Sequence, residues 1–262
     1  MRTNARQVPA ATTTGPRWFT PGQAPPDARV RLFLLPHAGS GAAVYRRWGR
    51  LLPAGIGAQA VTLPGRQNRR TEPLPTDWEE LVDELHRAMV AELDDRPYAL
   101  FGHCLGAQLA YRLAVALEAD GHQPPELVGV SGWAPRGFFR APADHHLIPR
   151  HEMVDWIVNL GAIPAEIRED TDMLDLVLPP VIADFRVAAQ YQDDGASIGC
   201  PLVSYGGRSD SLREDPTAMD SWQTRSRHYL GHHEYPGGHF YVNEQAPAVA
   251  ADLTGELLRL TG

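Results

Sequence analysis

One stretch of the chain has the residue types and spacing of a covalent catalyst. The sequence GHCLG at residues 102–106 follows a short apolar run that begins at Tyr98, and an apolar helix pattern starts directly after it. This is the G-x-S-x-G pattern of a nucleophile elbow, with cysteine in the serine position. Glycines flank the nucleophile because a tight strand-to-helix turn strains the backbone and brings its neighbours close. The stretch therefore predicts Cys104 as a nucleophile.

Two further residues could complete a catalytic triad with Cys104. Asp210 ends the segment GGRSD and His239 ends PGGH, and each segment directly follows a predicted strand. The histidine would take the thiol proton, while the carboxylate would fix its tautomer and stabilise the imidazolium. Two other carboxylates could replace Asp210 but lie further from the strand end: Asp215 and Asp220. We favour Asp210.

A glycine-bearing loop could supply the groups that stabilise negative charge on a substrate carbonyl. Residues 36–41 (PHAGSG) follow the β-type run 29–35 (RVRLFLL), and a helix pattern is predicted over 43–52. Free backbone N–H groups in such a loop can form an oxyanion hole. The alternative is an ordinary strand-to-helix turn.

Alternating strands and helices must position these residues. Residues 1–28 are predicted to be a mostly irregular arm, with Trp18 and Phe19 anchoring its end, and 29–262 to be one domain. The alternation predicts an α/β fold with a mostly parallel central sheet and helices on both faces. The predicted strands are 29–35, 58–63, 98–101, 127–131, 201–205 and 232–235.

A helical lid is predicted over about 134–195, because so long an interval without strands exceeds a simple connection. Helix patterns cover about 150–160, 166–178 and 180–191, with breaks at Gly161 and at Pro179-Pro180. Its apolar residues could line an acyl pocket or, as we favour for most of them, pack the lid's own core. They are Met153, Trp156, Ile157, Met173, Leu174, Leu176 and Val177.

Two features lie between the second and third predicted strands. The arginine-rich run 64–70 (PGRQNRR) is typical of a solvated loop, although it could attract an acidic partner. Asp77 is a predicted N-cap with Glu80 three residues later, opening a helix that ends near Leu93.

Composition restricts the class of protein. The chain has 262 residues and a formal net charge of −8, which argues against nucleic acid or an anionic membrane as the main partner. No apolar run approaches the roughly 18 residues of a membrane span, and the N-terminus lacks an apolar signal core. Cys104 and Cys200 are expected to be free thiols in a reducing cytoplasm. Cys200 has the position of a small buried apolar residue.

The remaining histidines are expected to be structural. His103 lies in the elbow, where packing or hydrogen bonding explains it. His145, His146 and His151 lack the HExxH spacing or cysteine partners of a zinc site, so no metal site is predicted.

The chain resembles the type II (editing) thioesterases of polyketide and non-ribosomal peptide assembly lines, within the α/β-hydrolase superfamily. The resemblance implies an enzyme that removes acyl groups from the phosphopantetheine thiol of carrier-protein domains. It also implies an oxyanion hole from the backbone N–H groups of Ala38 and Leu105, a monomer, and no metal or dissociable cofactor, since phosphopantetheine or CoA arrives with the substrate. The matching segments run from about Trp18 to the C-terminus: RLFLLPHAGSGAAVYRRW, LPGRQNR, LFGHCLGAQLAYRLA, LPPVIADFRVAAQY, GGRSD and YPGGHFYVNEQ.

The departure from this family is Cys104, where serine is usual. The sequence leaves open whether the cysteine is natural or a serine-to-cysteine change that traps an acyl-enzyme. A thiolate beside His239 is a strong nucleophile, and its acyl-enzyme is a thioester that amines and thiols also attack. Hydrolytic editing is therefore the main hypothesis. Acyl transfer or cyclising release and a weakly catalytic carrier-binding module are the alternatives.

Overall fold

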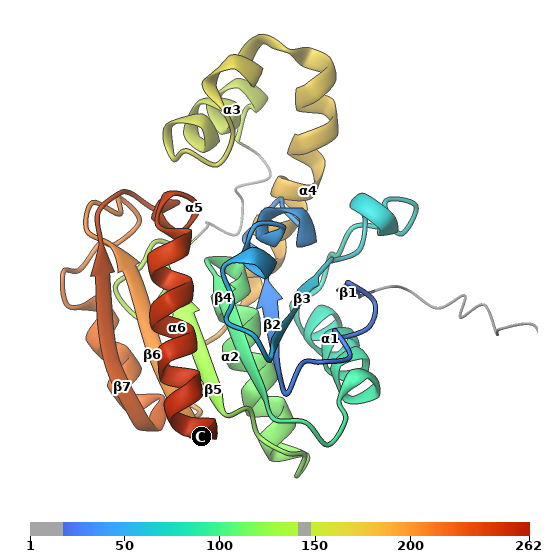
Figure 1. Ribbon diagram of the computed structural model, residues 1–262. Helices are drawn as coiled ribbons and strands as arrows, with labels where there is room; N and C mark the ends of the chain where they lie inside the picture. The colour runs from blue at the N-terminus through green and yellow to red at the C-terminus, as the bar shows by residue number, and fades with distance from the viewer. Residues whose placement is uncertain (1–17, 141–147) are drawn as a thin grey trace, which may run out of the picture.

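The computed structural model describes residues 18–140 and 148–262, which fold around one seven-stranded sheet (Figure 1). The strand order is β1-β3-β2-β4-β5-β6-β7, and every neighbouring pair is parallel except β1 with β3. This confirms the predicted α/β class. The strands are β1 (Phe19–Thr20), β2 (Val30–Leu35), β3 (Ile56–Val61), β4 (Tyr98–His103), β5 (Leu127–Ser131), β6 (Ile198–Gly207) and β7 (Ser226–Tyr235).

Helices cover both faces of the sheet. Two of them, α1 and α2, pack on one face, and α6 packs on the other (Figure 1). The α-helices are α1 (Trp78–Glu92), α2 (Leu105–Ala119), α3 (Arg150–Asn159), α4 (Thr171–Gln190), α5 (Tyr241–Glu244) and α6 (Ala246–Thr261). Short 3-10 helices span Ala42–Tyr45, Trp48–Arg50, Gln67–Arg69, Ala165–Glu169 and Ala218–Thr224. In this described part of the chain, no helix is long and apolar enough to cross a membrane.

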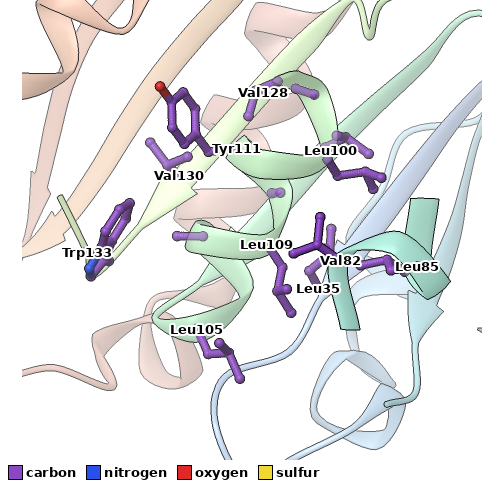
Figure 2. Close-up of a cluster of buried hydrophobic side chains, with 14 of the residues drawn as sticks. Leu35, Val82, Leu85, Leu100, Leu105, Leu109, Tyr111, Val128, Val130 and Trp133 are labelled. Atoms are coloured by element: carbon purple, nitrogen blue, oxygen red, sulfur yellow. The ribbon is translucent and has the colours of Figure 1, made fainter. Parts of the chain in front are cut away.

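The helix that follows Cys104 is held by a leucine stripe against the sheet. Leu105, Leu109, Leu113 and Leu117 recur every four residues, so they share one face of α2, and all four are buried. Figure 2 shows Leu109 beside Leu35 of β2 and Val82 of α1, with Leu105 at the start of α2. Burying one leucine contributes about 1.5–3 kcal/mol, so this stripe fixes α2 and the elbow at its start.

Other local predictions have mixed outcomes. Asp77 caps α1 as expected, since its carboxylate accepts from the Glu80 N–H at 2.9 Å. Trp18 and Phe19 anchor the arm, but Phe19 also pairs with β3, so that end is a strand rather than irregular. Residues 1–17 lie outside the described residues.

Two helix predictions were wrong. The pattern over 43–52 forms two 3-10 turns rather than one α-helix. Pro179 and Pro180 lie inside α4 instead of breaking it. A proline inside a helix costs about 3 kcal/mol, and burial of the adjacent Leu178 and Val181 offsets this cost.

Helices α3 and α4 lie between β5 and β6, where the lid was predicted, and they rise above the sheet (Figure 1). They share a small core of Met153, Val154, Ile157, Leu174, Leu178 and Val181. Met173 and Leu176 were expected to be pocket or core residues, but 41% and 70% of their surfaces are exposed. They lie on the outer side of α4, so the apolar pattern overestimated the width of its buried face.

Candidate active site

The elbow geometry matches the strained turn that the glycines predicted. Cys104 has φ 57° and ψ −118°, between the last residue of β4 and the first of α2. Its backbone N–H donates to the Ser131 carbonyl at 2.8 Å, which ties the turn to β5. A Cβ on Gly102 would lie 1.9 Å from the Gly106 oxygen, and one on Gly106 would lie 2.1 Å from the Leu35 oxygen. Both positions therefore exclude any side chain.

The predicted acid and histidine are paired. The Asp210 Oδ2 lies 2.9 Å from the His239 Nδ1, and 7% and 2% of the two residues are exposed. The other oxygen of Asp210 accepts from the Leu212 N–H, which fixes the carboxylate. Asp215 is exposed and accepts from Thr217 instead. Of the described carboxylates, Asp210 is thus the one that orients His239.

The electrostatics of His239 favour its charged form. Burial acts to lower the pKa of the ring, but the adjacent Cys104 and the hydrogen bond with Asp210 outweigh it and raise the pKa to about 10. The Nε2 atom is buried and makes no hydrogen bond of ordinary geometry with the described residues. Because no described residue holds it in a hydrogen bond, the His239 Nε2 is available to exchange a proton with a reacting group.

Two neighbouring histidines are held neutral. Burial is the main reason that the pKa of His37 falls to about 4 and that the pKa of His103 lies well below its usual value. His103 lies 2.9 Å from the Ser131 hydroxyl, which in turn lies 2.6 Å from the Tyr241 hydroxyl. The prediction that His103 is structural agrees with this buried network.

A narrow pocket joins the reactive groups. Its volume is about 50 Å³, and Cys104, His239, Ala38 and Leu105 all line it. Among the described residues, the backbone N–H groups of Ala38 and Leu105 have no hydrogen-bond acceptor, as an oxyanion hole requires. The structure therefore brings together the residues expected at the site, while their catalytic roles remain predictions. The other lining side chains are mainly aromatic or aliphatic, including Trp133, Phe138, Phe139, Phe185, Ala188 and Leu212.

The arginine-rich run corrects a prediction. Arg66 is 5% exposed rather than solvated, and its guanidinium binds both oxygens of Asp184, with one N···O distance of 2.7 Å. Asp184 is fully buried on α4, and its Oδ2 also accepts from the Gly39 N–H at 2.7 Å. Arg66 further donates to the Ser40 carbonyl. The lid helix thus holds the loop that carries Ala38.

The sequence patterns did not predict this pair, although Arg66 lies in LPGRQNR and Asp184 in LPPVIADFRVAAQY. Asp184 is the one carboxylate among the apolar residues of LPPVIADF, and a single charge on a buried helical face requires a partner. That position was the available signal. Its partner could not be identified, because Arg66 lies 118 residues away in sequence.

The second cysteine and the remaining histidines that the structure describes add no catalytic or metal-binding group to the pocket of Cys104. Cys200 is buried as predicted, and burial followed by the nearby Glu118 raises the pKa of its thiol. His151 is exposed, whereas His145 and His146 lie outside the described residues. Of the residues that the structure describes, one group could offer three metal ligands, at the opposite end of α2 from Cys104: His86, Asp120 and His122.

Known proteins are similar to this chain over most of its length. A family model described as the thioesterase domain matches residues 30–257. Gramicidin S biosynthesis protein GrsT of Aneurinibacillus migulanus is 29% identical over 87% of this chain and 89% of its own length. Thioesterase PikA5 of Streptomyces venezuelae is 30% identical over 94% and 87%. The solved structure of the type II thioesterase BorB from the borrelidin biosynthetic cluster is 30% identical, with a TM-score of 0.81 over 94% of this chain and 99% of that one.

Proposed function

The chain belongs to the thioesterase domain family and is a thioester hydrolase, and from this premise we propose that it is an editing enzyme of polyketide or non-ribosomal peptide biosynthesis. Its substrates are acyl groups on the phosphopantetheine arm of carrier proteins. The observation that supports this most strongly is the His239–Asp210 pair beside Cys104 in one narrow pocket. The related PikA5 is named a thioesterase, and BorB is named a type II thioesterase from a biosynthetic cluster.

The proposed mechanism has two halves. In the first, the Cys104 thiol gives its proton to His239 and its sulfur attacks the thioester carbonyl, and the oxyanion accepts hydrogen bonds from the Ala38 and Leu105 N–H groups. Protonated His239 then gives its proton to the departing pantetheine thiol, leaving an acyl-cysteine thioester. In the second half, neutral His239 takes a proton from water as the water attacks that thioester. Collapse of the second oxyanion breaks the C–S bond, and His239 returns its proton to the Cys104 sulfur, which releases the acid and restores the thiol.

The pocket favours short acyl groups. One water molecule needs about 10–15 Å³ of such cavity volume, so a pocket of about 50 Å³ has room for only a few heavy atoms unless the lid moves. A long chain that must fold back on itself for cyclisation does not fit this space. Removal of short stalled units is therefore preferred over cyclising release.

Acyl transfer is the second candidate, and the chemistry of Cys104 favours it. The acyl-enzyme and the substrate are both thioesters, so acylation is nearly balanced in free energy and an external amine or thiol can compete with water. A binding module without catalysis is disfavoured, since the paired His239 and Asp210 serve no evident docking purpose.

One assay separates these candidates. The protein is incubated with butanoyl-pantetheine, and released thiol and free acid are followed together. Equal yields of thiol and acid support hydrolysis, whereas product formed only after addition of an amine or alcohol supports transfer. No thiol release from any acyl-pantetheine would contradict both enzymatic proposals.

A further inference from the structure

Two side chains that line the pocket each carry a buried polar atom with no hydrogen-bond partner among the described residues. Gln108 and Tyr191 line the same pocket as Cys104, and only 9% and 4% of their surfaces are exposed. Among the described residues, neither the Gln108 Oε1 nor the Tyr191 hydroxyl has a hydrogen-bond partner. Leaving such a group unpaired costs about 1–3 kcal/mol, and native proteins do so rarely. The pair therefore indicates a ligand with a polar group.

The two atoms have complementary hydrogen-bonding roles. The Gln108 Oε1 is an acceptor, so it requires a donor. Burial, followed by nearby charges including Asp193, raises the pKa of Tyr191 to about 12. Its hydroxyl therefore stays protonated at neutral pH and can donate. A ligand hydroxyl can donate to the Gln108 Oε1 and accept from the Tyr191 hydroxyl. If the amide of Gln108 is rotated so that its nitrogen faces the ligand, the same hydroxyl can accept from that nitrogen.

The location of Gln108 indicates which part of the acyl group it would meet. Gln108 follows Cys104 by one helical turn, and its backbone N–H lies 3.3 Å from the Cys104 carbonyl oxygen. Four residues of α-helix advance about 6 Å along the axis. An acyl group attached to the Cys104 sulfur would cover that distance with its first few carbons.

Resting on the proposed function, we infer that the preferred substrates are short acyl groups with a hydroxyl near the thioester, read by Gln108 and Tyr191. The aromatic and aliphatic lining holds the carbon chain, while the two polar atoms select the hydroxyl. Sites built to bind a hydroxyl reject analogues that lack it, because the buried polar groups then remain unpaired. Unsubstituted acyl groups of equal length are therefore poorer substrates.

The test compares kcat/KM for 3-hydroxybutanoyl-pantetheine and butanoyl-pantetheine. The wild-type protein is expected to prefer the hydroxylated thioester by about tenfold. Gln108→Leu removes the acceptor at similar size, so the preference falls to within about twofold. Tyr191→Phe removes only the hydroxyl and lowers the preference by a smaller factor. Exposed Gln123→Leu is the matched control and leaves the preference unchanged.

Equal kcat/KM for the two thioesters in the wild-type protein, or an unchanged preference in both pocket variants, overturns the inference. Cleavage of neither thioester is a different result, since it refutes the proposed function. The specificity is then tested with the corresponding non-cleavable amides, whose Kd values for Cys104→Ala are measured by calorimetry. Tighter binding of the hydroxylated amide, lost in the Gln108→Leu background, supports the inference, and equal binding overturns it.

Discussion

The edge of the sheet and the lid hold their charged residues in opposite ways. At the edge, Asp210 and His239 are buried and paired, and their elements belong to two large cores. In the lid, the Arg150–Asp175 ion pair is 51% and 61% exposed and lies beside a core of six residues. Helix α4 connects the regions, because Asp175 lies in its exposed part and Asp184 in its buried part.

The contrast within α4 shows that burial decides what an ion pair contributes. Asp175 meets Arg150 in solvent, where such pairs contribute about 0–1 kcal/mol. Asp184 meets Arg66 where both side chains are buried, so each charge requires the other as its partner. Asp184 also accepts a hydrogen bond from the Gly39 N–H. The exposed pair therefore contributes little to holding the lid helices together, whereas the buried pair fixes the loop beside Cys104.

Removing the nucleophile is expected to have the largest effect. Cys104→Ala should lower thiol release from acyl-pantetheine by at least about 10³-fold and remove any acyl adduct detected by intact mass. The fold should be unchanged, because the side chain is partly exposed. Cys200→Ala is the matched control, and its protein should keep the turnover. An adduct that survives Cys104→Ala would refute the assignment of the nucleophile.

The next largest effect is expected at the buried pair of α4. Asp184→Asn leaves Arg66 buried without a counter-charge, so the free energy of unfolding should fall by about 3–5 kcal/mol in urea titrations. kcat should fall as well, because the loop that carries Ala38 loses its anchor. Asp175→Asn, on the same helix but exposed, should change the stability by at most about 1 kcal/mol. Equal losses in the two variants would contradict the contrast.

The pKa of His239 tests the charge at the sheet edge. It is raised from 6.5 to about 10, against the lowering effect of burial, first by Cys104 and then by Asp210. The stability from the charged ring is thus complete below pH 6.5 and lost as pH rises towards 10. NMR titration of labelled imidazoles should show a lower pKa for His239 in Cys104→Ala. His37 is an internal control, since its pKa is lowered to about 4 and it stays neutral at pH 7.

The smallest effect is expected on the outer side of the lid. Leu176 is 70% exposed, so Leu176→Ala should change the free energy of unfolding by no more than about 0.5 kcal/mol. Leu178, two residues later, is 2% exposed, and its replacement by alanine should cost about 2–5 kcal/mol. Thermal unfolding followed by circular dichroism distinguishes the two. Similar losses would show that the lid buries Leu176 in solution.

The local patterns predicted much of the fold because they report short-range physics. The leucine spacing of α2 and the cap at Asp77 depend on residues three or four apart, and both predictions agree with the structure. The proline prediction failed for a tertiary reason. Proline breaks an isolated helix, but packing of Leu178 and Val181 within the lid maintains α4 through Pro179 and Pro180.

The sequence by itself determined the elbow, since only glycine fits at Gly102 and Gly106 around a strained Cys104, and it determined the order of the triad candidates along the chain. Only the tertiary structure decided which distant charges meet. Arg66 and Asp184 are separated by 118 residues, and no local pattern encodes their contact. Whether such groups are hydrated or paired depends on what the folded chain places around them, and that burial sets their free energy.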